Sequence, residues 1–220
     1  MCNGQNHLVG EFGSVSRLSS EEAGKRRATA LKILAYGMLL FLVFTFGTVF
    51  ELTVTRGVCF VYVISYFMAL VVVAAIRQVG WRWTGVAVFL PYAVIGLPAV
   101  YMIEVVMEPT LIAPWAAILS SLTGPLAGLT ADMAYRTLPK SIRAELRSAL
   151  TGMFTDLGYF VFMLLSLAFL YKDPAPGLAH YLNGIYLTLP WLLVNGALGG
   201  YTAHKMTERG KAEPHRNPHL

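Results

Sequence analysis

The chain has 220 residues, of which 56% are hydrophobic and 13% are charged, and its formal net charge is +5. A soluble domain of this size carries about a quarter charged residues, so the composition argues against a water-soluble domain and favours lipid as the main solvent. The two cysteines, Cys2 and Cys59, lie in a tail and in a hydrophobic stretch, which makes a disulfide improbable.

The first hydrophobic stretch follows a polar segment that is rich in serine and glycine. We expect residues 1–27 to form a disordered cytoplasmic tail, because they contain no apolar run. The stretch at 28–50 is longer than the apolar region of a signal peptide, about 7–15 residues, and no small-residue cleavage site follows it. We therefore interpret it as a retained first membrane-spanning helix.

Six segments reach the roughly 20 mostly apolar residues that a helix needs to cross a bilayer. They are residues 28–50, 57–76, 84–107, 111–135, 150–171 and 185–206. Lysine and arginine favour cytoplasmic loops, and with the N-terminus inside only Arg56 and Lys172 fall in outer loops. The predicted fold is an all-α, polytopic bundle of six transmembrane helices (28–206) in the inner (plasma) membrane, with both termini cytoplasmic and a tail at 207–220. This placement of basic residues explains the positive charge without nucleic acid as a partner.

The connection after the fourth span has an amphipathic pattern. Ile142, Leu146 and Leu150 recur at four-residue intervals, and charged residues occupy the other faces. The spacing predicts a short amphipathic helix over 139–149 on the cytoplasmic side. Such a helix either lies on anionic membrane lipid as a connector or docks a partner.

Ionisable and amide groups inside a membrane are costly, so each is a functional candidate. Asp132 and Arg136 are four residues apart near the inner end of the fourth span, and we interpret them as a structural ion pair. Asp156, near the inner end of the fifth span, is interpreted as structural and bound by an arginine of a neighbouring loop. Asn195 lies near the middle of the sixth span, where its amide requires a partner helix or a ligand.

A second polar group is predicted at the outer end of the bundle. Glu51 ends the first span, Glu104 lies in the last turn of the third, and Tyr101 and Trp115 are nearby. Carboxylates beside aromatic rings suit a cationic or hydrogen-bonding aromatic ligand, and Asn183 stands where it would close such a pocket. The alternative is that these are ordinary residues of a membrane interface, where Trp, Tyr and snorkelling Glu are common.

Small residues at four-residue spacing predict close helix contacts. Gly124 and Gly128 lie in the fourth span, and Gly196 and Gly200 lie in the sixth. Such spacing lets helix backbones approach one another, within the chain or against another subunit.

Several enzyme classes are excluded by missing motifs. The sequence has no HExxH motif, no GxSxG elbow, no paired-aspartate motif of phospholipid synthases and no Walker motif. Three of the five histidines are in the tails, so no three can meet in the bilayer around a metal. We therefore expect no catalytic residues, no metal site and no cofactor, and any use of ATP requires a partner.

The size, the six predicted helices and two small-residue motifs resemble the substrate-binding (S) component of an energy-coupling factor (ECF) vitamin transporter. Residues 124–128 resemble a Gly-Pro-x-Ala-Gly-like segment in a middle helix of that family, and Pro190, Asn195, Gly199 and Gly200 resemble the pattern of its last helix. The resemblance implies a protein that captures a vitamin-like small molecule in the outer half of the bundle. It also implies a transmembrane coupling subunit and ATPase subunits as partners.

Two other functions are left open by the residues alone. One is a small accessory subunit of a larger integral-membrane complex, with no ligand of its own. The other is a self-sufficient secondary carrier that uses Glu51, Glu104 or Asp156 as a proton site. Such carriers usually contain an internal repeat and matching broken helices, and the sequence has neither.

Overall fold

The computed structural model describes residues 6–50, 63–107, 121–170, 182–183 and 185–212. Within these ranges the protein contains six long helices and no strand, so the all-α prediction is confirmed. The helices overlap the six predicted spans in order. They are α1 (Asn6–Phe50), α2 (Ser65–Val79), α3 (Thr84–Met107), α5 (Thr123–Thr137), α6 (Ala144–Leu170) and α8 (Ile185–Ala212).

Two of the described helices are long and apolar enough to cross a membrane. The segments that qualify are Glu22–Gly47 of α1 and Ala144–Ser166 of α6, whereas α2 and the first half of α3 are apolar but shorter. Large apolar side chains of α1 also face outward, among them Leu31, Leu34 and Phe46. A long exposed apolar surface of this kind is expected to contact lipid or another protein rather than water.

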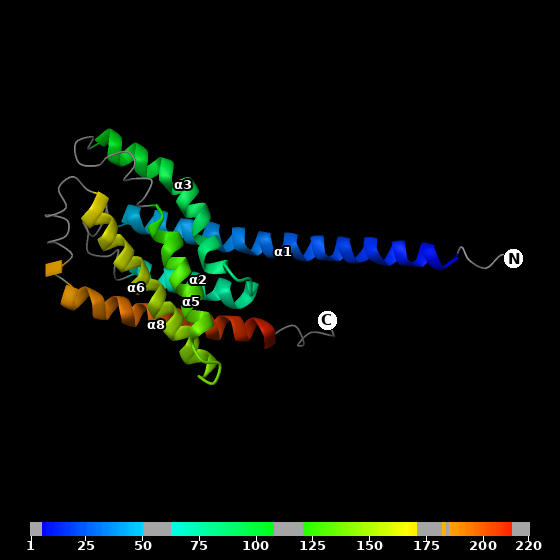
Figure 1. Ribbon diagram of the computed structural model, residues 1–220. Coiled ribbons are helices and arrows are strands. Elements are labelled where there is room, and N and C mark those ends of the chain that lie inside the picture. The colour runs from blue at the N-terminus through cyan, green and yellow to red at the C-terminus, as the bar shows by residue number, and fades with distance from the viewer. Residues whose placement is uncertain (1–5, 51–62, 108–120, 171–181, 184, 213–220) are drawn as a thin grey trace, which may run out of the picture.

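Two boundaries differ from those expected. α1 is continuous from Asn6, so most of the segment expected to be a disordered tail is helical. A helix of 45 residues is about 68 Å long, and Figure 1 shows α1 projecting well beyond the other helices. Residues 139–143 form turns and bends, and the amphipathic segment predicted at 139–149 continues from Ala144 as the first turns of α6.

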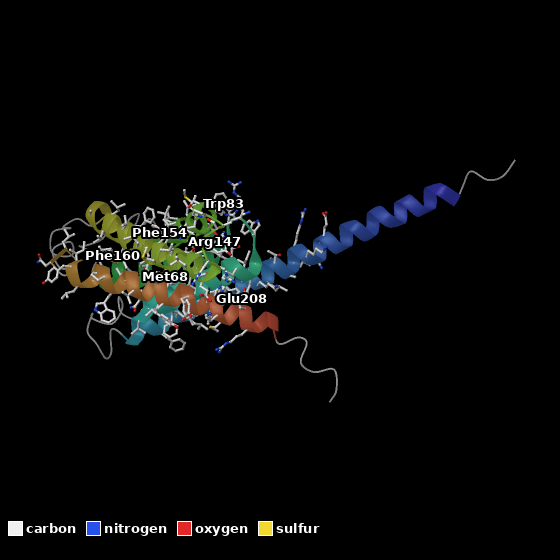
Figure 2. All side chains as sticks on the ribbon, turned by 90° about the horizontal axis from the view of Figure 1, so that it is seen from below. Met68, Trp83, Arg147, Phe154, Phe160 and Glu208 are labelled. Carbon is white, nitrogen blue, oxygen red and sulfur yellow. The ribbon has the colours of Figure 1, made fainter. Side chains whose placement is uncertain are left out.

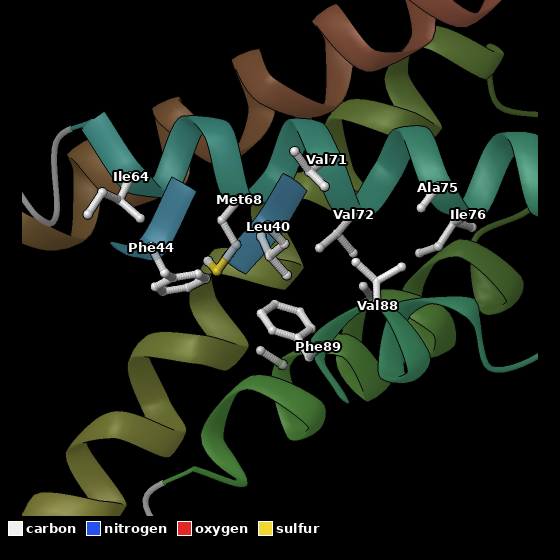
Figure 3. Packing of buried hydrophobic residues seen from close by; sticks show 12 residues of the cluster. Leu40, Phe44, Ile64, Met68, Val71, Val72, Ala75, Ile76, Val88 and Phe89 are labelled. Atoms are coloured by element: carbon white, nitrogen blue, oxygen red, sulfur yellow. The ribbon is translucent and has the colours of Figure 1, made fainter. Parts of the chain in front are cut away.

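α2 is the central helix of the bundle, and it contacts each of the other helices in the described ranges. Its residues 71–76 are all buried, so this part of α2 has no solvent-facing side. Figure 3 shows the resulting core, in which Leu40 and Phe44 of α1 and Phe89 of α3 gather against α2. Gly124 of α5 lies under the ring of Phe89, where a Cβ would be 2.7 Å from Cδ1 of that ring.

Glycines bring two further helix pairs into backbone contact. A Cβ on Gly85 of α3 would lie 2.5 Å from the carbonyl oxygen of Gly128 on α5. Between α6 and α8, a Cβ on Gly196 would lie 2.7 Å from the carbonyl oxygen of Gly152, and Gly200 also lies against the backbone of α6. Real Cβ atoms essentially never come closer than 3.0 Å, so a larger residue at these crossings forces the helices apart.

The described lysine and arginine side chains gather toward one end of the bundle, which we call the basic end. This end contains the last turns of α2, α5 and α8, the first turns of α3 and α6, and the part of α1 that leaves the bundle. Figure 2 shows Trp83, Arg147 and Glu208 at this end and Phe160 in the opposite half. The distribution of positive charge predicts that the basic end faces the cytoplasm.

Candidate functional site

The basic end is held together by Arg77, at the end of α2. Its side chain is only 9% exposed, and its guanidinium donates hydrogen bonds to Thr207 Oγ1 of α8 (2.8 Å) and Ser148 Oγ of α6 (3.1 Å). It also forms a 2.6 Å ion pair with Glu208 Oε1 of α8. A planar group with several fixed donors suits this role, because it binds two neighbouring helices at once.

A second bridge at this end joins α6 to α8. Lys205 Nζ donates to Glu145 Oε1 at 2.6 Å, and His204 Nε2 lies 3.9 Å from the same oxygen. The lysine and glutamate side chains are 45% and 42% exposed, so this ion pair contributes little to stability.

The sequence predicts that Asp132 and Arg136 pair with each other; in the structure Asp132 binds the start of α3 and Arg136 binds the turn just before it. The carboxylate of Asp132 accepts hydrogen bonds from the amides of Gly85 (3.0 Å) and Val86 (3.1 Å), and Arg136 Nη2 donates to the carbonyl oxygen of Trp81 (3.3 Å). The first amides of a helix have no partner within the helix, so they attract a nearby carboxylate. These two residues therefore join α5 to α3 and serve the structure of the bundle.

Three polar side chains lie at one level in the interior, on three different helices. Asn195 Nδ2 of α8 donates to Ser65 Oγ of α2 at 3.3 Å. The neighbouring Gly196 faces α6, where a Cβ would lie 2.9 Å from Asp156 Oδ2. Asp156 is fully buried, and neither of its carboxylate oxygens has a hydrogen-bond partner in the part of the chain that the structure describes. We call Ser65, Asn195 and Asp156 the polar layer.

A cavity of about 20 Å³ lies beside the polar layer, on the side away from the basic end. A cavity of this volume holds about one water molecule. The ring of Phe44 stacks on Tyr92 at 4.5 Å between centroids and tilts against Tyr159 at 5.6 Å. The residues that line this cavity include Phe44, Ser65, Met68, Tyr159, Phe160 and Met163.

A second hollow is an open groove of about 460 Å³ between α1 and α3. Its lining residues, which include Leu34, Met38, Leu90 and Val94, are all apolar. A site for a specific small molecule needs a few polar groups that fix its orientation, and this groove supplies none. The cavity beside the polar layer is therefore the better candidate for a ligand site.

Of the predicted ligand-binding residues, Asn195 is buried and belongs to the polar layer. Asn183 is exposed ahead of α8 and does not join it. The other four predicted positions lie outside the described side chains: Tyr101 and Glu104, whose backbones are part of α3, and Glu51 and Trp115, whose backbones are not described either.

Sequence reasoning did not identify Ser65 or the cavity, and it paired Asp156 with an arginine of a neighbouring loop. Arg147 instead donates to the carbonyl oxygen of Tyr135, and Arg77 is bound to α6 and α8 at the basic end. One signal was available in the sequence, because Asp156 is the only charged residue between 150 and 171. An isolated charge inside a span is itself a functional indication.

No protein-family model, no curated protein and no solved structure matches the chain. The polar layer and the cavity beside it are the features on which a function can be proposed.

Proposed function

We propose that the chain is the membrane substrate-capture subunit of an ATP-driven uptake transporter for a vitamin-like small molecule. It crosses the plasma membrane six times, with the basic end toward the cytoplasm, and binds its ligand in the opposite, outer half of the bundle. A transmembrane coupling subunit and ATPase subunits are separate chains, because this sequence contains no nucleotide-binding motif. The chain itself catalyses no reaction.

The observation that supports this proposal is the polar layer beside an aromatic cavity. Small-molecule sites combine mostly apolar, aromatic walls with a few polar groups that fix orientation. Here Ser65, which accepts a hydrogen bond from Asn195 behind it, supplies the polar group of the lining, and Phe44 and Tyr159 supply the aromatic wall. The cavity holds only about one water molecule, so a vitamin-sized ligand requires the helices of the outer half to move apart.

Native mass spectrometry of gently purified protein tests the proposal, and Asn195→Ala is the informative variant. We expect the wild-type protein to retain a small molecule and Asn195→Ala to bind it about 5- to 150-fold more weakly, because Ser65, the polar group of the lining, loses the hydrogen bond from Asn195 that orients it. Tyr66→Phe is the matched control. Tyr66 Oη donates to Thr202 Oγ1 at 3.1 Å, so this variant also removes a hydrogen bond between α2 and α8 but leaves the cavity lining intact.

One outcome contradicts the proposed function, and two others change the location of the site. A retained partner chain without a small molecule favours the alternative, a structural or accessory subunit of a larger integral-membrane complex. Equal affinities of wild type, Asn195→Ala and Tyr66→Phe for the retained molecule move the site away from the polar layer. Weaker binding by Glu104→Gln or Trp115→Ala would extend the site to the outer end, as the sequence predicts.

A further inference from the structure

Asp156 lies in an environment that does not stabilise a free carboxylate. Its side chain is 0% exposed, and both oxygens lack a hydrogen-bond partner among the described residues. An isolated ionised carboxylate in an apolar interior is strongly unfavourable, so the group either holds a proton or faces a cation. The missing side chain of Gly196 provides the space that the carboxyl group occupies.

Neighbouring polar groups in the described ranges do not supply the missing partner. Thr155 and Thr151 donate their hydroxyls to carbonyl oxygens one turn back on α6, at 2.8 Å each, and Asn195 donates to Ser65. Two phenols on α6 and α8 lie away from the basic end: Tyr159 lines the cavity, and Tyr186 is exposed in the first turn of α8. The other described titratable groups on α6 and on the helices packed against it lie toward the basic end or bind another helix. They are Glu145, Arg147, Arg77, Asp132, Arg136, His204, Lys205, Glu208, Arg209 and the phenols of Tyr66, Tyr135 and Tyr201.

The position of Asp156 relates it to the cavity. Tyr159 and Phe160, which line the cavity, follow Asp156 by three and four positions, so all three lie on one face of α6. Asp156 does not itself line the cavity, and its backbone precedes that of the two lining residues by about one helical turn, roughly 5.4 Å along the axis. The faces of aromatic rings attract cations, and the rings of Phe44, Tyr159 and Phe160 line the cavity. A buried carboxylate that has no counter-ion among the described residues, on the same helix face as such rings, is complementary to a positively charged group.

We propose that Asp156 is the counter-ion for an ammonium group, so that the captured molecule is a protonated amine. This inference rests on the proposed function, because it names the substrate class of that site. The cavity fits one water-sized group, and an ammonium group has about that size. In the empty protein the carboxyl group holds a proton. Binding of R–NH₃⁺ forms the ion pair and releases this proton to water, so that charge and atoms balance.

Infrared spectroscopy of the purified full-length protein tests the inference, because a protonated carboxyl group has a carbonyl stretching band that a carboxylate lacks. The probe is methylammonium chloride, and sodium chloride at the same concentration controls for ionic strength. We expect the wild-type protein to show the acid band, methylammonium to remove it and sodium to leave it. Since the probe competes with a proton, its apparent affinity should rise about tenfold for each pH unit while the empty site is protonated.

Asp156→Asn should lack the band and bind methylammonium roughly 30-fold or more weakly, because one member of a buried charge pair is removed. Asp132→Asn is the matched control, since Asp132 is also buried but is bound by backbone amides of α3. It should keep the acid band and its response to methylammonium. If Asp156→Asn does not fold, the comparison of methylammonium with sodium on the wild-type protein still decides the question.

An acid band that methylammonium leaves unchanged means that Asp156 is a neutral structural group, and this overturns the inference. A wild-type protein without the band contains an ionised Asp156, which overturns it as well. Either failure is distinguishable from failure of the proposed function. If mass spectrometry shows a retained neutral or anionic molecule, the capture function is supported and the protonated-amine substrate class is refuted. If methylammonium removes the acid band but the chain retains no small molecule, the ammonium site at Asp156 is supported and the capture function is not.

Discussion

Gly128→Ala adds one methyl group where α5 meets the backbone of α3. The new Cβ would overlap the carbonyl oxygen of Gly85 and lie 2.5 Å from its carbonyl carbon and 2.7 Å from the amide nitrogen of Val86. These are backbone atoms, which cannot rotate away as the end of a flexible side chain can. The two helices must therefore separate locally to accommodate the methyl group.

The magnitude follows from three contributions. Overpacking costs about 1–3 kcal/mol, and the separation weakens the hydrogen bonds from Gly85 and Val86 to Asp132, now 3.0 and 3.1 Å long, at a further cost of about 1 kcal/mol. The higher helix propensity of alanine offsets about 1 kcal/mol. We expect a net loss of about 2 kcal/mol in the free energy of unfolding, which lowers the melting temperature by about 4–8 °C for a chain of this size.

Thermal unfolding of the purified protein in detergent, followed by tryptophan fluorescence, measures this difference. Gly210→Ala is the control, because a Cβ at that exposed position of α8 has nothing within 4 Å. It should leave the melting temperature unchanged or raise it slightly through helix propensity. Equal melting temperatures for Gly128→Ala and Gly210→Ala would refute the backbone contact between α3 and α5.

Two other predictions concern the basic end and the orientation of the chain. Arg77→Gln removes the side chain that joins α2 to α6 and α8, and we expect the free energy of unfolding to fall by about 1–3 kcal/mol. Arg209→Gln, at an exposed position of α8, should change it by less than about 0.5 kcal/mol, and equal effects of the two would contradict a role for the network. In a chain without native cysteines, a cysteine at Arg56 or Lys172 should be labelled from outside intact cells, and one at Lys140 only after permeabilisation. The reverse labelling pattern would overturn the proposed orientation.

The order and approximate length of the helices were predictable because their signals are local. Apolar length and the charges, prolines and glycines between segments are properties of a few neighbouring residues. The start of α1 was not predictable in the same way. Its first turns are polar, so burial gives no signal for them, yet no proline interrupts the chain between residues 6 and 50 and the helix continues through.

The partners of polar residues were less predictable, because they depend on which helices lie side by side. The spacing of Asp132 and Arg136 permits a pair within one helix, but the unsatisfied amides at the start of α3 bind the carboxylate. The sequence also shows that Asp156 is the lone charge of its span. It does not show that Gly196 of α8 lies across from it, and that placement buries the carboxyl group where no described residue is its hydrogen-bond partner.

The two halves of the bundle differ in how easily their helices can separate. At the polar layer and toward the basic end, α6 and α8 are in backbone contact at Gly196 and Gly200, and Arg77 binds both helices to α2. In the half away from the basic end, Pro190 lies inside α8 five residues before Asn195. Proline has no amide hydrogen, so the helix loses one hydrogen bond there and bends at lower cost. Opening of the cavity should therefore begin in the part of α8 before Asn195, while α6 and α8 stay together at the glycine crossings.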